Sequence, residues 1–209
     1  MRTCSAILAA AALSLAAGCD PAAMGGGSKT AAVAVAGRSV NIVAPGSFCV
    51  DPASTNVSAS GAFVMVSDCA LLGGRPPEGD GAPIGAVMTA SISAAALASD
   101  GAGAPSLAEI ARFAGTAEGR AMLSRSGHGD RVRIRATRTR GDVLYMLIED
   151  RGPPPIAGIE PQFWRAFLEV QGQMTVLSVL GFEDAGVGPS QGLAYLQSFA
   201  DAVQRANPG

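Results

Sequence analysis

The sequence RVRIRATRTRGDVLYMLIEDR, residues 131–151, carries the strongest strand signal in the chain. Val, Ile, Leu and Tyr cluster on both sides of Gly141-Asp142, a dipeptide typical of a turn between two strands. We therefore expect a pair of strands over Arg131–Arg140 and Asp142–Arg151. The run from Leu144 to Ile148 is apolar at both alternating positions, which predicts a strand buried on both faces of a sheet.

Apolar alternation and cap residues predict further strands and helices on either side of this pair. The expected strands are Arg38–Ala44, Ala62–Asp68, Gly85–Ser93 and Met174–Phe182. The expected helices are one after the capping box Ser106-Leu107-Ala108-Glu109, one over Thr116–Ser124, a short one around Phe163-Trp164 and an amphipathic one over Gly192–Arg205. Asp51-Pro52 begins either a turn or a short helix, and residues 73–81 and Pro153–Pro155 are expected loops. This order predicts an α+β fold, a largely antiparallel sheet with helices packed on it and a long C-terminal helix.

The C-terminal half of the chain also resembles a known family. Trp164, the paired strands, Gly181-Phe182 and a terminal helix that contains Phe199 together resemble the α-β-α sandwich of the PsbP family. The resemblance implies that fold for the C-terminal half, and no functional residue follows from it.

Composition limits the class of protein. The chain has 209 residues, of which 48% are hydrophobic and 15% charged, enough apolar material for one core of ordinary size. Its 27 Gly and 13 Pro fall below the share that marks low-complexity disorder. The formal net charge of -2 gives no reason to expect a nucleic-acid binder.

The N-terminus has the pattern of a secretory signal. Arg2 supplies a positive charge, and the 15 residues from Cys4 to Gly18 carry no charge and end in small residues. A membrane-spanning helix needs about 20 strongly apolar residues, whereas this run is short, rich in Ala and followed by Asp20-Pro21. Residues 1–18 are therefore expected to be removed, either as a lipoprotein signal or as an ordinary cleaved signal with a chance cysteine.

The end of this signal, Leu15-Ala16-Ala17-Gly18-Cys19, resembles the lipobox of bacterial lipoprotein precursors. The resemblance implies cleavage before Cys19, diacylglycerol on its thiol and acylation of the new amine, by palmitate or a similar chain. Asp20, the next residue, then favours retention at the inner membrane over the outer one. Residues 19–37 are small and nearly uncharged, so we expect a flexible tether there and a single folded domain over residues 38–209.

Two cysteines remain once Cys4 is removed with the signal and Cys19 is assigned to lipid. In an exported chain this even remainder predicts a disulfide between Cys49 and Cys69, which follow or end apolar runs. Two buried free thiols, or a cysteine nucleophile served by His128, are the alternatives.

Charge is unevenly placed along the chain. Between Arg112 and Arg140 lie eight arginines and two acidic residues, a local net charge of +6. Arg131, Arg133 and Arg135 share one parity of the expected strand, whereas Arg138 and Arg140 have the other, which suggests a bulge or the end of the ladder. This face either binds an anionic partner, such as an acidic protein or lipid headgroups, or is neutralised by the chain's own Asp142 and Glu149.

Candidate catalytic groups are few. Gly188-Pro189-Ser190-Gln191-Gly192 matches the G-x-S-x-G of serine hydrolases, but no His follows Ser190, so Ser190 or Gly188 is better interpreted as a helix N-cap. His128 is the single histidine and lies between two glycines, as in an exposed turn. The adjacent acids of Glu149-Asp150 and of Glu183-Asp184 point to opposite faces of their strands and are expected to be solvated. No catalytic residue, metal site or cofactor is predicted.

The sequence therefore predicts a lipid-anchored protein of the bacterial envelope that faces the periplasm. We expect no enzymatic activity and a role in binding a protein or another envelope component, with the membrane itself reached through the lipid anchor. The alternative is a tethered small-ligand-binding or hydrolytic domain. A pocket lined by convergent polar groups would favour an enzyme, and an exposed apolar or basic face would favour an interaction module.

Overall fold

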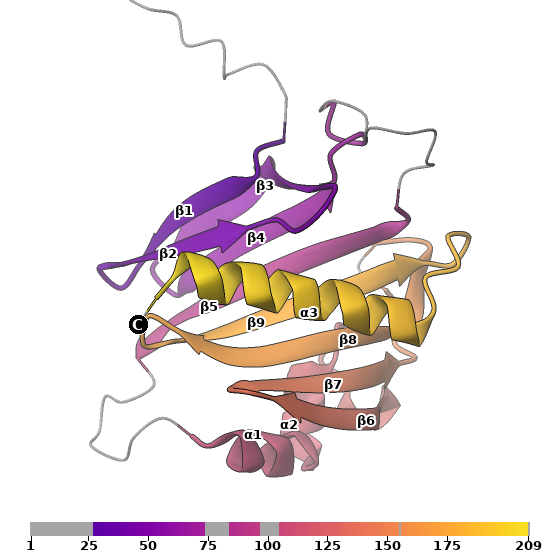
Figure 1. Ribbon diagram of the computed structural model, residues 1–209. Helices are drawn as coiled ribbons and strands as arrows, with labels where there is room; N and C mark the ends of the chain where they lie inside the picture. Colours follow the sequence, from indigo (N-terminus) through magenta and orange to yellow (C-terminus); the bar gives the residue numbers. More distant parts are fainter. Residues whose placement is uncertain (1–26, 74–83, 97–104, 155, 209) are drawn as a thin grey trace, which may run out of the picture.

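The structure, a computed structural model, describes residues 27–73, 84–96, 105–154 and 156–208. Its centre is a seven-stranded antiparallel sheet (Figure 1). In spatial order the strands are β3 (Phe48–Ser58), β4 (Gly61–Asp68), β5 (Ala86–Ala96), β9 (Gln173–Phe182), β8 (Ile159–Val170), β7 (Val143–Asp150) and β6 (Val132–Arg140). The predicted α+β class and antiparallel sheet are confirmed.

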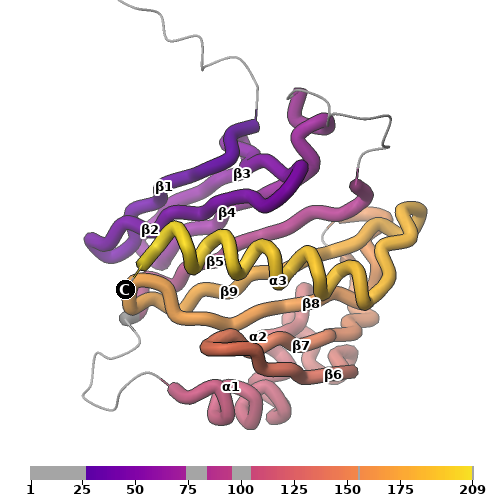
Figure 2. The backbone as a smooth tube through the Cα atoms, in the orientation of Figure 1, coloured from indigo at the N-terminus to yellow at the C-terminus, as the bar shows by residue number. Residues whose placement is uncertain are grey.

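One face of the sheet is covered by a β-hairpin and the long C-terminal helix, which lie next to each other in front of the sheet in Figures 1 and 2. The hairpin joins β1 (Thr30–Val35) to β2 (Arg38–Val43), and the helix is α3 (Pro189–Ala206). Two amide side-chain contacts fix the end of α3 to β2. The Asn207 Nδ2 donates to the Asn41 carbonyl at 2.7 Å, and the Asn41 N–H donates to the Asn207 Oδ1 at 2.8 Å.

The opposite face of the sheet is covered at its β6–β7 end by two short helices, α1 (Leu107–Ala114) and α2 (Ala117–Leu123). A 3-10 helix over Gly129–Arg131 leads from them into β6. Helices on both faces agree with the layering expected for the C-terminal half. None of the described helices is long and apolar enough to span a membrane.

The strand β7 belongs to both layers of the core. Val143 and Tyr145 pack with residues of α3, whereas Leu144, Met146 and Ile148 pack with residues of α1 and α2. The prediction of a strand buried on both faces is therefore confirmed. Burying these side chains stabilises the fold by roughly 25 cal/mol per Å² of apolar surface removed from water. Strand β7 therefore contributes to the apolar core on both faces of the sheet.

The helix predicted around Phe163-Trp164 is wrong, because these residues lie in β8. Phe163 packs on the α1–α2 side and Trp164 on the α3 side, the alternation of a strand between two apolar layers. The indole Nε1 of Trp164 donates to the Pro189 carbonyl at 2.7 Å, which satisfies this buried donor at the start of α3.

Two other segments differ from expectation. Residues 30–35 of the expected tether form β1, because alternate side chains such as Val33 and Val35 are buried. The folded domain therefore begins before Arg38. Asp51-Pro52 begins neither a turn nor a helix. It lies within β3, where the pairing with β4 shifts register between Asp51 and Asn56, and this irregularity accommodates a proline that cannot donate to the ladder.

Helix caps agree with the sequence. Ser106 and Glu109 form the predicted capping box of α1, Thr116 caps α2 and Gly188 is the N-cap of α3, with Pro189 at its first turn. Residues 74–81 of the predicted loop, Pro155, and the signal, lipobox and tether through residue 26 lie outside the described residues.

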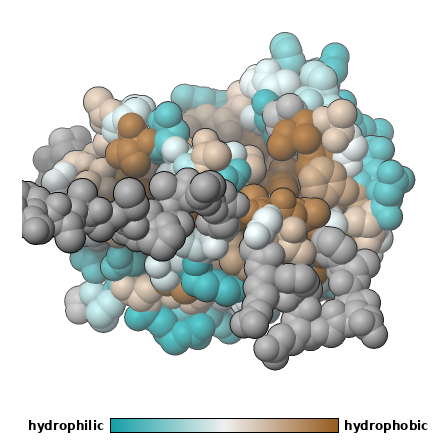
Figure 3. Space-filling model, turned by 90° about the horizontal axis from the view of Figure 1, so that it is seen from above, coloured by the Kyte–Doolittle hydropathy of each residue, from teal (hydrophilic) through white to brown (hydrophobic). Residues whose placement is uncertain are grey.

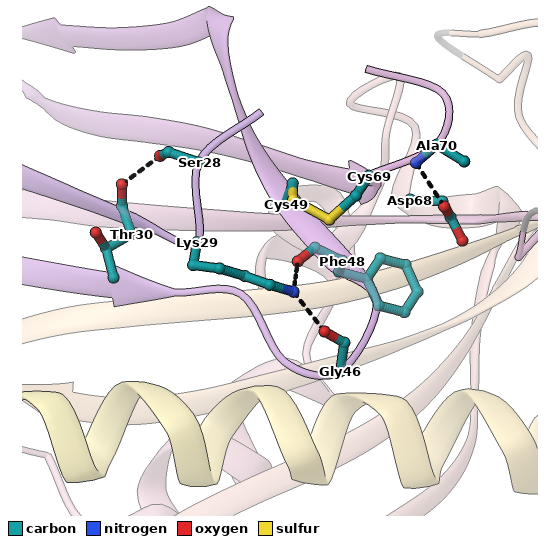
Figure 4. Close-up of a disulfide and its surroundings, with 9 residues drawn as sticks. All are labelled: Ser28, Lys29, Thr30, Gly46, Phe48, Cys49, Asp68, Cys69 and Ala70. Atoms are coloured by element: carbon teal, nitrogen blue, oxygen red, sulfur yellow. Dashed lines mark hydrogen bonds between the residues drawn. A yellow bond between two sulfur atoms is a disulfide. The ribbon is translucent and has the colours of Figure 1, made fainter. Parts of the chain in front are cut away.

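The disulfide between Cys49 and Cys69 is present and links β3 to the end of β4 (Figure 4). The incoming chain is fixed beside it. Ser28 and Val50 exchange backbone hydrogen bonds at 2.7 and 3.2 Å, and the Lys29 ammonium donates to the Phe48 carbonyl at 2.6 Å and to that of Gly46. These contacts place the described start of the domain beside the disulfide.

Candidate functional site

A pocket of about 630 Å³ lies between the α1–α2 helices and the sheet. Its volume is within the range of pockets that enclose a small ligand, roughly 300–1,000 Å³. Its lining is mostly apolar and comes from α1, α2, β8 and β9, with Pro105 two residues before α1: Pro105, Glu109, Ile110, Phe113, Ala114, Gly119, Met122, Leu123, Arg165, Phe167, Met174 and Val176. We call it the Arg165 pocket.

The two helices are held in place by close packing at a glycine. A Cβ atom at Gly119 would lie 2.0 Å from the Phe113 carbonyl oxygen, so only glycine lets the start of α2 approach the end of α1 this closely. The capping box at Ser106 fixes the start of α1. The helices therefore form a fixed roof over the pocket.

Arg165 is the cation of this pocket. Its Nε donates to the Ser178 hydroxyl and its Nη1 to the Leu123 carbonyl, both at 3.3 Å, and the Nη2 has no hydrogen-bond partner among the described residues. The residue lies deep in the molecule, but part of its surface stays open to the pocket. Burial, with a smaller contribution from the nearby charge of Arg125, lowers the pKa of Arg165 to about 10. The guanidinium remains charged at neutral pH.

A second arginine and a single carboxylate complete this buried cluster. Arg125 and Arg165 each have their guanidinium carbon 5.2 Å from the centroid of the Phe163 ring. The Asp150 side chain is fully buried, and its Oδ2 lies 3.7 Å from the Arg125 Nε. Two cations thus share one carboxylate, which leaves the cluster with a net positive charge facing the pocket.

The rim of the Arg165 pocket is exposed. Phe113 and Met122 are 41% and 70% exposed, so the rim of the pocket is apolar. Glu109, the other charged residue of the lining, is engaged at the start of α1, where its carboxylate accepts from the N–H and the hydroxyl of Ser106 at 2.8 Å. Those hydrogen bonds lower the pKa of Glu109.

The arginines of β6 do form a basic face, but its residues differ from the predicted set of Arg131, Arg133 and Arg135. The pairing of β6 with β7 shifts register between Ile134 and Ala136, which is the bulge suggested by the parity change. Arg133 is opposite Glu149, Arg138 opposite Tyr145 and Arg140 opposite Val143, and these three β7 residues share one face. The bulge therefore aligns Arg133, Arg135, Arg138 and Arg140 on the α3 side of this edge strand, and we call them the basic stripe.

The basic stripe is neutralised in part. The Arg135 Nε lies 2.5 Å from Glu149, which also binds Arg151 at 2.6 Å, and Arg140 pairs with Asp201 of α3. Among the described residues no salt bridge holds Arg133 or Arg138. Arg131 lies in the 3-10 helix, exposed and separate from the stripe, and Asp142 is exposed and joins none of the salt bridges of the described chain.

The adjacent acids Glu149 and Asp150 are buried, so the expectation that they are solvated is wrong. They do point to opposite faces, Glu149 toward the basic stripe and Asp150 toward Arg125, because neighbouring residues of a strand alternate. Each carboxylate is stabilised by arginine, which explains how both can be charged and buried.

Another pocket, of about 370 Å³, lies at the start of α3. Gly188 and Gly192 of the G-x-S-x-G sequence line it, but Ser190 is not part of its lining. Glu160 and Glu183 also line it, and burial together with the charge of Glu183 raises the pKa of Glu160. His128 is exposed at the 3-10 helix on the way into β6. Among the described residues no three His, Cys, Asp or Glu side chains gather as metal ligands.

Apolar side chains also reach the surface outside these pockets. Figure 3 shows hydrophobic residues in separate groups on the upper face of the molecule, with hydrophilic residues between them. Scattered groups of this kind are common on monomeric proteins. The Arg165 pocket differs because its apolar lining converges on a partly buried charge, and it is the candidate functional site.

Sequence reasoning missed Arg165 because the segment around it was assigned to a helix. Phe163, Arg165 and Phe167 alternate with Trp164, Ala166 and Leu168. As a strand, this pattern places one arginine between two aromatic residues on an apolar face, where a charge needs a partner or a ligand.

Comparison with known proteins gives little. No protein-family model and no curated protein matches the chain. Among solved structures, the chain is similar to the Ran-binding protein Mog1p of Saccharomyces cerevisiae, at 13% sequence identity and a TM-score of 0.44, over 84% of this chain and 93% of Mog1p.

Proposed function

We propose that this chain is a lipid-anchored protein of the bacterial envelope that binds an apolar ligand in the Arg165 pocket without transforming it. The observation that carries the proposal is the pocket itself, a largely apolar cavity of about 630 Å³ with an exposed apolar rim. Apolar pockets with a few placed polar groups are the usual form of small-molecule sites. The lining contains one cation, Arg165, and one carboxylate, Glu109, which belongs to the capping box of α1. These groups are suited to binding a ligand.

The anchor follows from the lipobox-like sequence and Cys19. Because the described domain starts at Gly27, only residues 20–26 separate it from the acylated cysteine. Seven extended residues reach at most about 25 Å, at roughly 3.5 Å per residue. The domain is then held close to the periplasmic face of the membrane, with Asp20 favouring the inner one.

The arrangement of the fold gives the pocket an orientation. In Figure 1 the described start of the chain lies at the top, and α1 and α2 lie at the opposite end. A domain held by its N-terminus therefore turns the Arg165 pocket away from the bilayer. This orientation suits a protein that receives its ligand from the periplasm or from another protein.

The anchor is tested by the Cys19→Ser variant. We expect the wild-type protein in membrane fractions, with an intact mass that begins at Cys19 and includes acyl chains, and the variant released. Tight membrane association of the variant would contradict the anchor and leave the pocket proposal intact.

The pocket is tested with N-phenyl-1-naphthylamine, a neutral apolar dye that fluoresces when it leaves water. We expect the wild-type domain to bind it and Val176→Phe, which fills the pocket from β9, to bind it several-fold less. Val57→Phe is the matched control, since Val57 is 51% exposed on β3 and does not line the pocket. Absence of dye binding by the folded wild-type protein would contradict the proposed function.

A second candidate function is recognition of an acidic protein surface by the basic stripe. Arg133 and Arg138 favour it, because neither has a salt bridge among the described residues and both are exposed. Guanidinium groups bind carboxylates through paired hydrogen bonds.

A further inference from the structure

We propose that the ligand of the Arg165 pocket is a single-chain amphiphile with a carboxylate head group, held by the Arg165 guanidinium while its hydrocarbon chain lies along the apolar lining. This inference rests on the proposed function, because it names the chemical class of ligand for the same pocket. Four observations carry it, and they concern charge, hydrogen bonds, position and the number of free donors.

The first observation is the charge balance of the buried cluster. In the described part of the chain, Asp150 is the buried carboxylate nearest to Arg125 and Arg165, and its oxygens already accept four hydrogen bonds or ion contacts. Oδ2 accepts from the Arg125 N–H at 2.7 Å and the Ser124 hydroxyl at 3.2 Å and lies beside the Arg125 Nε, and Oδ1 accepts from the Gly152 N–H at 2.8 Å. Asp150 therefore makes its direct contacts with residues 124, 125 and 152, and among the described residues no carboxylate hydrogen-bonds to Arg165.

The second observation is the weakness of the contacts that Arg165 does make. Its two acceptors, the Ser178 hydroxyl and the Leu123 carbonyl, are both neutral and both 3.3 Å away. Ion pairs between guanidinium and carboxylate are usually shorter, roughly 2.7–2.9 Å. A cation taken out of water is costly unless an anion accompanies it, so a bound carboxylate would offset a cost that the domain alone does not offset.

The third observation is where Arg165 lies within the pocket. It belongs to β8 and sits opposite Ser178 of β9, while the next pair on the same face is Phe167 and Val176. Phe167, Val176 and Met174 extend the wall in one direction from the cation, and the helix side chains Ile110 and Phe113 form the roof. The pocket thus offers one cationic end and one long apolar side, with the other charged residue of the lining, Glu109, engaged by Ser106 at the start of α1, and this arrangement suits an amphiphile.

The fourth observation concerns how many donors are free. Arg125 does not line the pocket, and its Nη1 and Nη2 are directed to the Glu160 carbonyl at 3.1 Å and the Asp150 carbonyl at 2.8 Å, so Arg165 is the arginine that faces a ligand there. One guanidinium with a free Nη2 matches a monoanion with two oxygens, whereas a phosphate carries more charge and more acceptors than this site satisfies. These donors favour a carboxylate.

The experiment measures displacement of N-phenyl-1-naphthylamine by three compounds with the same ten-carbon chain, namely decanoate, decan-1-ol and decyl phosphate. The protein is the full exported chain with Cys19→Ser, so that attached acyl chains do not compete. We expect decanoate to bind wild-type protein about tenfold or more tightly than decan-1-ol, since hydrogen bonds to charged groups favour binding by at least that factor. Decyl phosphate should bind no more tightly than decanoate.

The Arg165→Gln variant should lose this preference and bind decanoate and decan-1-ol equally. Arg205→Gln, the matched change at an exposed arginine of α3 outside the pocket and the basic stripe, should keep it. Should Arg165→Gln fail to fold, the wild-type comparison decides by itself, supported by Arg165→Lys, which keeps the charge and should keep part of the preference. Equal binding of decanoate and decan-1-ol by the wild-type protein would overturn the head-group inference and leave the pocket function standing. Tighter binding of decyl phosphate would overturn the carboxylate, and binding of neither dye nor decanoate would remove the proposed function as well.

Discussion

Arg125 and Asp150 bind each other through both main chain and side chain. The Arg125 N–H donates to the Asp150 Oδ2 at 2.7 Å, and the Arg125 Nη2 donates back to the Asp150 carbonyl at 2.8 Å. Their side chains are 5% and 0% exposed. This reciprocal contact fixes the loop after α2 to the end of β7, and Leu123, the last residue of α2, supplies the carbonyl that Arg165 contacts.

Asp150→Asn should destabilise the domain by about 3–5 kcal/mol, because removing one charge of a buried pair leaves the other uncompensated. Here two cations, Arg125 and Arg165, would remain. Equilibrium urea denaturation measures the change. The control is Asp142→Asn, an exposed acid in the β6–β7 turn, which should change the free energy of unfolding by less than about 0.5 kcal/mol. Equal effects of the two substitutions would contradict the role of the buried pair.

Stability should also fall at acid pH through Asp150. Burial acts to raise the pKa of Asp150, but the hydrogen bonds from Arg125, Gly152 and Ser124 and the charge of Arg125 outweigh it, and the pKa is lowered. A lowered pKa stabilises the fold above the unfolded value, about 3.9, and this contribution disappears as the pH falls through the folded value. The loss of melting temperature from pH 6 to pH 3 should therefore be larger for wild-type protein than for Asp150→Asn. Parallel pH profiles would show that Asp150 is not the group concerned.

The disulfide should contribute about 3 kcal/mol, the value expected for closing a loop of this length in the chain-entropy model. Cys49 and Cys69 are separated by 20 residues, and their bond joins β3 to β4 beside the start of the domain. Replacement of both by serine should lower the free energy of unfolding by about that amount and leave dye binding unchanged, since the Arg165 pocket lies on other elements. A variant as stable as the wild-type protein would contradict a structural role for the bond.

The parts of the fold that follow from local pattern were predictable. The β6–β7 pair, the capping box at Ser106 and the C-terminal helix all depend on residues within one or two turns of chain, and all are present. The prediction for the segment around Trp164 was wrong because its apolar residues, Phe163, Trp164 and Ala166 to Leu168, fall at both parities and have no period that separates a strand from a buried helix. The strand β1 failed because small alternating residues such as Ala32 and Ala34 are equally compatible with a tether.

The candidate site could be predicted less well than the fold. The basic stripe was visible because its arginines are neighbours in sequence, although the bulge at Arg135 decides which of them share a face. The Arg165 pocket is formed by residues from 105 to 176, and its charge balance depends on a hydrogen bond from Arg125 to Asp150 across 25 residues. Nothing local in the sequence indicates that Asp150 contacts Arg125 directly, or that the hydrogen bonds of Arg165 go only to neutral acceptors among the described residues.

Glu160→Gln should raise the melting temperature at neutral pH. Burial, and next the charge of Glu183, raises the pKa of Glu160, so its ionised form opposes folding. A raised carboxyl pKa means that stability is highest below the unfolded value, about 4.3, and declines as the pH rises through the folded value. The stabilisation by Glu160→Gln should thus be seen at pH 7 and shrink toward pH 4. An increase that is the same at both pH values would point to packing rather than charge. Glu169→Gln, an exposed acid at the other end of β8, is the matched control.

The basic stripe predicts a contrast between two neighbouring arginines. Arg135 binds the buried carboxylate of Glu149, whereas Arg133 has no salt bridge among the described residues although it lies opposite Glu149. Arg135→Gln should lower the melting temperature slightly, because Arg151 still pairs with Glu149. Arg133→Gln should leave the melting temperature unchanged or raise it, because it relieves repulsion within the stripe.

Binding to an acidic partner should depend more on Arg133 and Arg138 than on Arg135. With polyglutamate as probe at low salt, the double variant Arg133→Gln/Arg138→Gln should lose more affinity than Arg135→Gln, since the unpaired guanidiniums are the ones free to bind carboxylates. Wild-type binding should also weaken as salt rises from about 0.02 M to about 0.5 M, where screening shortens the Debye length well below 10 Å. Binding that is insensitive to salt, or a larger effect of Arg135→Gln, would contradict recognition of an acidic partner. The stripe would then act to protect the β6 edge of the sheet. An edge strand rich in arginine also resists pairing with other chains, so aggregation of the double variant would support that structural role.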